Sequence, residues 1–359
     1  MDFLKDWIDW LFEPTRYFFG FVFVIFAVLK WRKIFSLPIF IIAFFVFGTI
    51  GLLWAMADSN FMKIIGKPDN IPIVILLATV VYFSWLSLRQ AVVNDERTAR
   101  GEPTLEAELA KKKVFTWPDL VYVEFICIIL FTAALIIWSI KIPAPIEEAA
   151  ELSRTPNPSK APWYFLGLQE LLVYFDPWIA GVLLPGFIIV GLMAIPYVDT
   201  NPKGNGYYTF NERPFAISFF WVGFILFWVS FVILGTFLRG PNWSFFGPFE
   251  YWNLHKLQPM VNVDLSTYFW VKMLGQPLPD MILLREAPGI LLLGGYFVVL
   301  PVLLGKTLLK GLYAELGAAR YHVFFHLMLW FGLMPIKMLA RWVFSLKYIV
   351  AIPEYFFNV

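Results

Sequence analysis

Residues 119–140 read DLVYVEFICIILFTAALIIWSI, an almost unbroken apolar stretch whose two charged side chains, Asp119 and Glu124, fall near its beginning. A helix that crosses a bilayer needs about 20 mostly apolar residues, so this stretch is long enough to span. The whole chain has the same character. Of its 359 residues, 60% are hydrophobic and 15% are charged, and the mean hydropathy is +0.70. A soluble protein of this length could not bury so much apolar surface, so the sequence predicts an integral membrane protein.

Eight stretches of comparable length predict an all-α fold with about eight transmembrane helices. The first is the weakest, because Arg16 and Lys30 shorten its apolar core. We expect it to be tilted, or to extend upstream through Trp7, Trp10 and Phe12. The stretches are residues 14–30, 36–57, 71–88, 119–140, 177–198, 214–238, 287–305 and 321–344.

The basic residues predict the orientation of these helices. They gather in the loop after the third stretch, from Arg89 to Lys113, and in the loop after the first, from Lys30 to Lys33. Cytoplasmic loops are enriched in Lys and Arg, so we expect both loops in the cytoplasm and the chain in a bacterial inner membrane. Alternation then places the long Ile142–Asp176 loop, between the fourth and fifth spans, on the outer side.

The chain divides into five parts that differ in hydrophobicity, charge and aromatic content. We predict a three-span extension at residues 1–93, a charged cytoplasmic connector at 94–113, a central core at 114–240, an aromatic-rich outer loop at 241–286 and two closing spans at 287–359. The net charge of +2 is too small to indicate nucleic-acid binding. The lipid bilayer is the first expected partner.

Candidate metal ligands are few. The chain has one cysteine, Cys127, and three histidines, so we expect no metal site and no pair of bis-histidine haems. His322 and His326 are four residues apart and share a helical face. A ligand role for one of them and hydrogen bonding at the membrane boundary both stay open. His255 falls in the outer loop, where exposure to water or contact with a partner is expected.

Five motifs follow one another in the central core: FTWPDLVY at residues 115–122, IPAP at 142–145, TPNP at 155–158, APWYF at 161–165 and IPYVDTNP at 195–202. In order and spacing they resemble the carboxy-terminal half of cytochrome b. That half is a separate chain, subunit IV, in split bf-type complexes. The resemblance covers about residues 105–240.

The resemblance implies a subunit of a quinol:cytochrome c oxidoreductase, or of one with another electron acceptor, which is not active alone. Quinol, expected to be menaquinol, would be oxidised at the outer side with release of its protons. Haem b and an iron-sulfur cluster are expected on partner chains. Those partners are a haem-carrying amino-terminal half of cytochrome b, a Rieske-type iron-sulfur protein and a c-type cytochrome.

The family's Pro-Glu-Trp-Tyr motif forms part of the quinol pocket, and its glutamate accepts a quinol proton. Here Trp163 and Tyr164 match, whereas Ala161 and Pro162 replace the first two residues. The resemblance implies that Pro162, Trp163, Tyr164 and Phe165 line the quinol site and that Tyr164 is a catalytic residue.

Pro162 cannot take up a proton, and the nearest carboxylates that could replace the motif glutamate are Glu170 and Asp176, downstream in the same loop. In a helix, Glu170 lies two turns beyond Trp163 on the same face, and we predict it as the substitute acceptor. Two simpler interpretations stay open: Glu170 pairs with Arg154 or Lys160, and Asp176 caps the span that begins at Pro177.

Two further features also allow two interpretations each. Glu124, inside a span, indicates either a proton path or burial against a partner helix. The aromatic run 243–252 favours a membrane-interface belt over a cradle for a quinone ring.

For the whole chain, a non-catalytic membrane anchor or assembly subunit with a degenerate quinol site is the alternative function. A transporter or channel is disfavoured because the charges cluster in loops rather than at mid-membrane.

Overall fold

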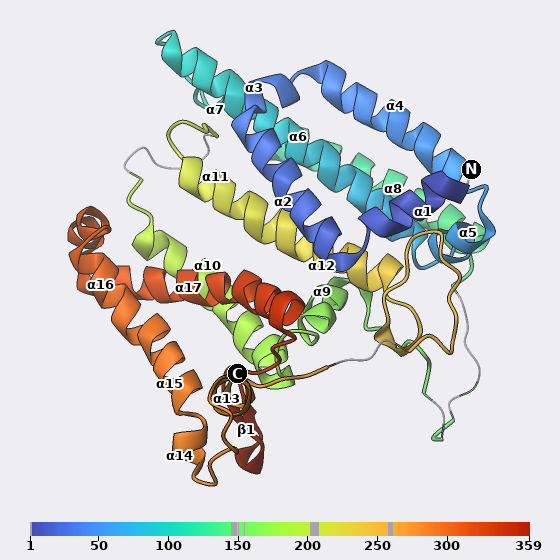
Figure 1. The fold of residues 1–359 in the computed structure, drawn as a ribbon. Coiled ribbons are helices and arrows are strands. Elements are labelled where there is room, and N and C mark those ends of the chain that lie inside the picture. The colour runs from blue at the N-terminus through green and yellow to red at the C-terminus, as the bar shows by residue number, and fades with distance from the viewer. Residues whose placement is uncertain (1, 145–148, 150, 154, 202–207, 258–260) are drawn as a thin grey trace. The chain divides into compact units, whose positions relative to one another are not determined.

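The computed structural model describes residues 2–144, 149, 151–153, 155–201, 208–257 and 261–359. The chain forms two compact units (Figure 1). Unit one comprises Met1–Tyr164 and Asn205–Leu257, and unit two comprises Phe165–Gly204 and Gln258–Val359.

The described residues contain 7 helices long and apolar enough to cross a membrane, or up to 8 if a bent pair counts as one span. This confirms an all-α integral membrane protein with about eight spans. The spans are α4 (Pro38–Ala55), α6 (Ile71–Ala99), η1 with α8 (Thr116–Lys141), η2 with α10 (Ile179–Val198), α11 through η4 (Pro214–Leu238), α15 through α16 (Ala287–Lys306) and α17 (Lys310–Phe344).

The bent pair is the weak first stretch. Helix α1 (Asp2–Leu11) and helix α2 (Pro14–Lys30) meet at an angle of 78°. Pro14 opens α2, and a proline there cannot continue the preceding helix because it lacks an N–H group. Trp7 and Trp10 therefore lie on a separate helix and Phe12 lies in the turn between the two, so none of them lengthens the span in a straight line.

In unit one, α2 packs against the π-helical segment η3 (Trp221–Val229), which lies between α11 (Pro214–Phe220) and α12 (Ser230–Ile233). The Phe18 and Phe227 ring centroids are 5.9 Å apart at this contact. The short helices α3 (Arg32–Phe35) and α5 (Ser59–Ile65) follow α2 and α4. Asp58 caps α5 by accepting hydrogen bonds from the amides of Asn60 and Phe61.

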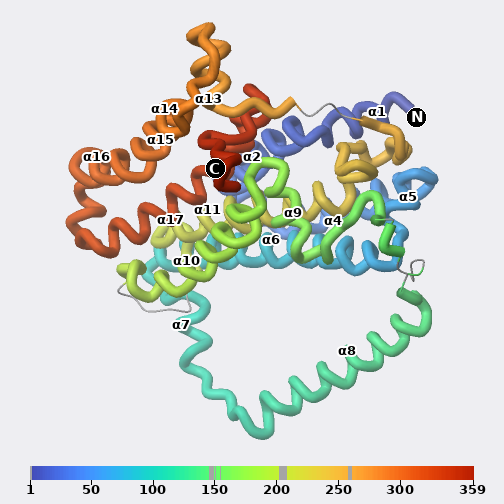
Figure 2. The backbone as a smooth tube through the Cα atoms, turned by 90° about the horizontal axis from the view of Figure 1, so that it is seen from below, coloured from blue at the N-terminus to red at the C-terminus, as the bar shows by residue number. Residues whose placement is uncertain are grey.

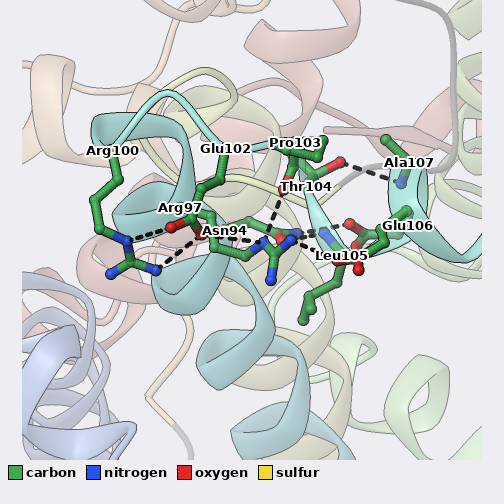
Figure 3. A network of polar contacts seen from close by, with 10 residues as sticks. Asn94, Arg97, Arg100, Glu102, Pro103, Thr104, Leu105, Glu106 and Ala107 are labelled. Carbon is green, nitrogen blue, oxygen red and sulfur yellow. Dashed lines mark hydrogen bonds and ion pairs between the residues drawn. The ribbon is translucent and has the colours of Figure 1, made fainter.

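The charged connector begins inside a helix, because α6 continues to Ala99. Beyond it, the short helix α7 (Leu105–Leu109) folds back on the end of α6 (Figure 3). The buried Asn94 side chain donates to Glu106 Oε2 at 2.7 Å and to the Tyr208 carbonyl at 2.9 Å, and it accepts from the Leu105 amide at 2.9 Å. The connector is therefore a folded corner of unit one.

Helix α8 (Val121–Lys141) lies apart from the other helices of its unit (Figure 2). It contains no buried residue among those that the structure describes, and Glu124 is exposed. An apolar helix of this kind needs lipid or another polypeptide around it.

In unit two, α17 packs against α10 (Leu184–Val198) and against α16 (Leu300–Lys306). The core on α17 consists of Leu316, Tyr321, Phe325 and Leu329. The Trp330 ring stacks on Phe187 at 4.7 Å and lies 4.8 Å from Phe297, between centroids. These contacts join the two closing spans to the fifth.

A C-terminal tail, residues 345–359, follows α17. It contains strand β1 (Ala351–Ile352), a 3-10 turn η8 (Pro353–Tyr355) and strand β2 (Phe357–Asn358), paired antiparallel with Ala351 opposite Asn358. Short helices also fill the loop before α15 (Ala287–Gly294): α13 (Leu265–Thr267), η6 (Tyr268–Met273) and α14 (Ile282–Arg285).

Candidate quinol-binding segment

Helix α9 (Trp163–Leu171) carries most of the predicted site residues. Leu166, Gly167, Glu170 and Leu171 are its buried residues, and their spacing defines one face. Trp163 is half-buried and stands at the same angular position as Glu170, seven residues or about 10 Å along the axis away. The predicted alignment of these two side chains is therefore present.

Three contacts within unit one hold the chain that leads into α9. Asn157 and Asn242 bind each other reciprocally, at 2.9 Å and 2.6 Å. The Lys160 ammonium donates to the Thr236 carbonyl at 2.8 Å. The Trp163 ring meets the Trp228 ring edge-on, with centroids 6.0 Å apart. The TPNP and APWYF motifs are thus attached to the span Pro214–Leu238 and to the loop after it.

The Trp163 ring continues an aromatic row on that span. Phe220, Phe224 and Trp228 follow one another at intervals of four residues, and their rings stack with centroid separations of 5.2 Å at both steps. The Tyr164 ring lies 5.7 Å from Trp163, edge to face. Aromatic faces of this kind suit a flat ring such as that of a quinol.

The four residues predicted to line the quinol site do not share one face. Tyr164 and Phe165 are both half-exposed, and Phe165 is displaced from Trp163 by about 200° around the helix. Pro162 is exposed. Only Trp163 and Tyr164 are in mutual ring contact.

Glu170 is completely buried, with 0% of its surface exposed. It belongs to unit two, whereas Trp163 and Tyr164 belong to unit one. A shielded carboxyl group can take up a proton and hold it away from bulk water. Of the two cations predicted to pair with it, Lys160 binds the Thr236 carbonyl, and Arg154 lies outside the described residues.

Asp176 stands at the start of the next span. Its carboxylate accepts a hydrogen bond from the Trp178 amide at 3.4 Å and one from the Asn358 side chain at 3.1 Å. Its carbonyl accepts from the amides of Ile179 and Ala180. These contacts agree with the capping interpretation of Asp176.

The aromatic run 243–252 contributes to the core of unit one. Phe246 is fully buried and Phe249 nearly so. Phe249 packs against Trp54 and Phe61, with centroids 5.5 Å and 5.4 Å away. These two rings belong to neither an interface belt nor a quinone cradle.

His326 makes two contacts with backbone carbonyls. Its Nδ1 is 2.7 Å from the His322 carbonyl and its Nε2 is 3.0 Å from the Phe297 carbonyl. Hydrogen bonding, the simpler of the two interpretations of this histidine pair, is thus confirmed for His326. No group of three His, Cys, Asp or Glu side chains that could hold a metal occurs within the described part of the chain.

Sequence reasoning missed a polar cluster at the end of α17. Lys337 is 1% exposed and Glu286 is 1% exposed, and both contact the tail, Lys337 at the Lys347 carbonyl and Glu286 at the Ala351 amide. Burial lowers the pKa of Lys347 and raises the pKa of Asp264. The available signal was Lys337 itself, because an ionisable residue inside an apolar stretch indicates a special environment.

Comparison with known proteins bears on the α9 segment. No solved structure matches the chain. Residues 149–247 match the family described as Cytochrome b(C-terminal)/b6/petD. Three of the five motifs lie within these bounds, and the two at 115–122 and 142–145 precede them. Over residues 149–247 the chain is therefore similar to the cytochrome b carboxy-terminal family, whose members are subunits of quinol–cytochrome oxidoreductase complexes.

Proposed function

We propose that the protein is a subunit of a membrane quinol:cytochrome c oxidoreductase, or of one with a related acceptor, and that it forms part of the quinol-oxidation pocket on the outer side. One observation carries the proposal. Helix α9 lies within the segment similar to cytochrome b, and Glu170 is one of its buried residues.

The chemistry assigned to this helix is proton acceptance. Oxidation of a quinol releases two electrons and two protons. The Glu170 carboxylate would accept one proton as a general base, while Trp163 and Tyr164 contact the ring. The electrons leave through haem b and an iron-sulfur cluster held by partner chains. Those chains are the haem-carrying half of cytochrome b, a Rieske-type protein and a c-type cytochrome.

The distribution of basic residues supports this assignment. From it we expect the basic loops in the cytoplasm and the Ile142–Asp176 loop on the outer side of a bacterial inner membrane. Protons taken from quinol there are released away from the cytoplasm, which couples electron transfer to charge separation.

A second function is favoured by a specific observation. Pro162 occupies the position of the motif glutamate, and Glu170 is closed off from solvent. These features would also suit a subunit that anchors other redox chains and whose quinol site has degenerated.

The first experiment tests both functions on the native complex, purified through a tag on this chain. A reduced-minus-oxidised spectrum with a b-haem signal, and co-purifying cytochrome b and iron-sulfur chains, are expected. A colourless chain that purifies alone would overturn both functions.

In that complex, Glu170→Gln should lower quinol oxidation by about a hundredfold, the usual effect of losing a general base. Tyr164→Ala should depress turnover strongly while the complex stays assembled. Glu151→Gln, an exposed carboxyl in the same loop, is the matched control and should leave turnover unchanged. Full activity of both site variants would favour the anchor.

A further inference from the structure

The C-terminal tail returns to the segment that follows α9. After α17 the chain turns at Ser345, whose φ of 54° is left-handed. The tail then pairs with residue 263 in a parallel bridge, in which the Lys347 amide donates to the Val263 carbonyl at 2.9 Å. This turn brings Lys347 to the end of α9 within unit two.

Lys347 binds the turn that follows α9. Its ammonium donates to the Leu172 carbonyl at 3.1 Å and to the Val173 carbonyl at 3.4 Å. The last carbonyls of a helix lack partners within the helix, and the helix dipole makes this end negative. Helix α9 has no basic residue in its own last turn, so the tail supplies the cation.

Lys337 holds Lys347 in this position. From inside α17, the Lys337 ammonium donates to the Lys347 carbonyl at 2.5 Å. It also faces the Phe175 and Tyr348 rings, 5.6 Å and 5.8 Å from their centroids. A lysine so deeply buried is costly unless its charge is accommodated, and these contacts accommodate it by a carbonyl dipole and two ring faces.

A second attachment lies a few residues further on. The Trp178 indole donates to the Asn358 carbonyl at 2.9 Å, and the Asn358 side chain donates to Asp176 at 3.1 Å. The Trp178 ring also packs on Phe357, with centroids 5.3 Å apart. Residues 172–178 therefore contact both ends of the tail, Lys347 at one end and Phe357 and Asn358 at the other.

We infer that Lys347, fixed by Lys337, is a positioning residue for the Glu170 carboxyl. Leu172, whose carbonyl Lys347 binds, is two residues beyond Glu170 in the chain. The amides of Leu172 and Val173 donate to the carbonyls of Gln169 and Glu170, so by fixing this turn Lys347 restrains the rotation and height of the last helical turn, which carries the carboxyl. The tail lies outside residues 149–247, so this control is added by a part of the chain that does not match the cytochrome b family. The inference rests on the proposed function.

The test compares Lys347→Met with Lys347→Arg in the purified complex. Lys347→Met removes the donor but keeps the length of the side chain. Turnover should fall about tenfold with little change in KM for quinol, as expected when a catalytic group is displaced by a fraction of an ångström to an ångström. Lys347→Arg should restore most of the activity. Lys310→Met, at an exposed lysine of the same unit, is the control and should be silent.

A double variant distinguishes positioning from general support. If Lys347 acts through Glu170, the Lys347→Met and Glu170→Gln double variant should be no slower than Glu170→Gln alone, because the effects of residues that act as a unit do not add. Additive losses would overturn the inference. If Glu170→Gln lowers turnover but Lys347→Met does not, the inference is overturned and the proposed function stands. If Glu170→Gln leaves turnover unchanged, the role of Glu170 as proton acceptor is overturned.

If Lys347→Met does not assemble, Trp178→Phe serves the same purpose. It removes the indole N–H that binds Asn358, together with part of the ring system, and keeps an aromatic ring near Phe357. A similar fall in turnover, absent in the presence of Glu170→Gln, supports the inference, and normal turnover contradicts it.

Discussion

The buried ammonium of Lys337 donates to the Lys347 carbonyl at 2.5 Å, which ties the membrane-spanning helix α17 to the tail that follows it. Both residues belong to unit two. The bond has a direct consequence for how firmly the tail is held.

Lys337→Met should release the tail while α17 stays helical. The Lys347 carbonyl would lose its donor, and an unsatisfied buried polar group costs about 1–3 kcal/mol. We therefore expect residues 345–359 to become sensitive to protease in the detergent-solubilised protein. In the control variant Lys310→Met, the protease should cleave the tail at the same rate as in the unchanged protein. Equal protection of the tail in both variants would show that the bond does not hold it.

The corner between α6 and α7 provides a second prediction. Asn94→Ala would leave the Leu105 amide, seen beside Asn94 in Figure 3, and the Tyr208 carbonyl without their side-chain partner. Because both groups are only partly buried, their loss of a partner should lower the free energy of unfolding by about 1–2 kcal/mol. This loss of stability is measured as a drop in the thermal midpoint of the solubilised Asn94→Ala protein.

The matched control for that corner is Arg100→Ala. Arg100 binds Glu102 in an ion pair at 3.0 Å, and both side chains are well exposed, at 59% and 44%. Exposed pairs contribute at most about 1 kcal/mol, so the thermal midpoint should hardly move. An equal loss in both variants would refute the role given to Asn94.

Trp163 should matter to stability as well as to the proposed site. Trp163→Ala removes the edge-on contact with Trp228. Because the indole is only half-buried, we expect a cost of about 2 kcal/mol, below the range for fully buried tryptophan. Trp163→Phe keeps an aromatic edge and should recover more than half of the loss in thermal midpoint. If alanine and phenylalanine behave alike, the ring contact is not what anchors α9.

The spans could be predicted from the sequence because hydropathy is a local property of the chain. The stretch 214–238 is observed with those same bounds. The alignment of Trp163 with Glu170 was equally accessible, since it follows from helical periodicity alone. The departures come from single residues with steric consequences, such as Pro14, which separates α1 from α2.

The rest depends on contacts between distant parts of the chain. Lys347 meets Leu172 across 175 positions, and Asn94 meets Tyr208 across 114. Nothing in the sequence around Lys347 marks it as a partner of the turn after α9, because that turn is far away along the chain. The exposure of Phe165 could have been predicted from its angle on α9, whereas the burial of Phe246 depends on packing within unit one.

Acid should loosen the turn η8 of the tail through Glu354. Arg285 binds both Glu354 oxygens, each at 2.9 Å, and this hydrogen bonding holds the pKa of Glu354 below its ordinary value. A carboxylate with a lowered pKa stabilises the folded state fully above its unfolded pKa, about 4.3, and loses that contribution as the pH falls through the folded value. We expect protease sensitivity of the tail to rise below about pH 4.3 in the unchanged protein. Glu354→Gln should be partly sensitive at neutral pH and show a weaker pH dependence. An identical pH profile for the two proteins would mean that the Arg285–Glu354 pair does not restrain the tail.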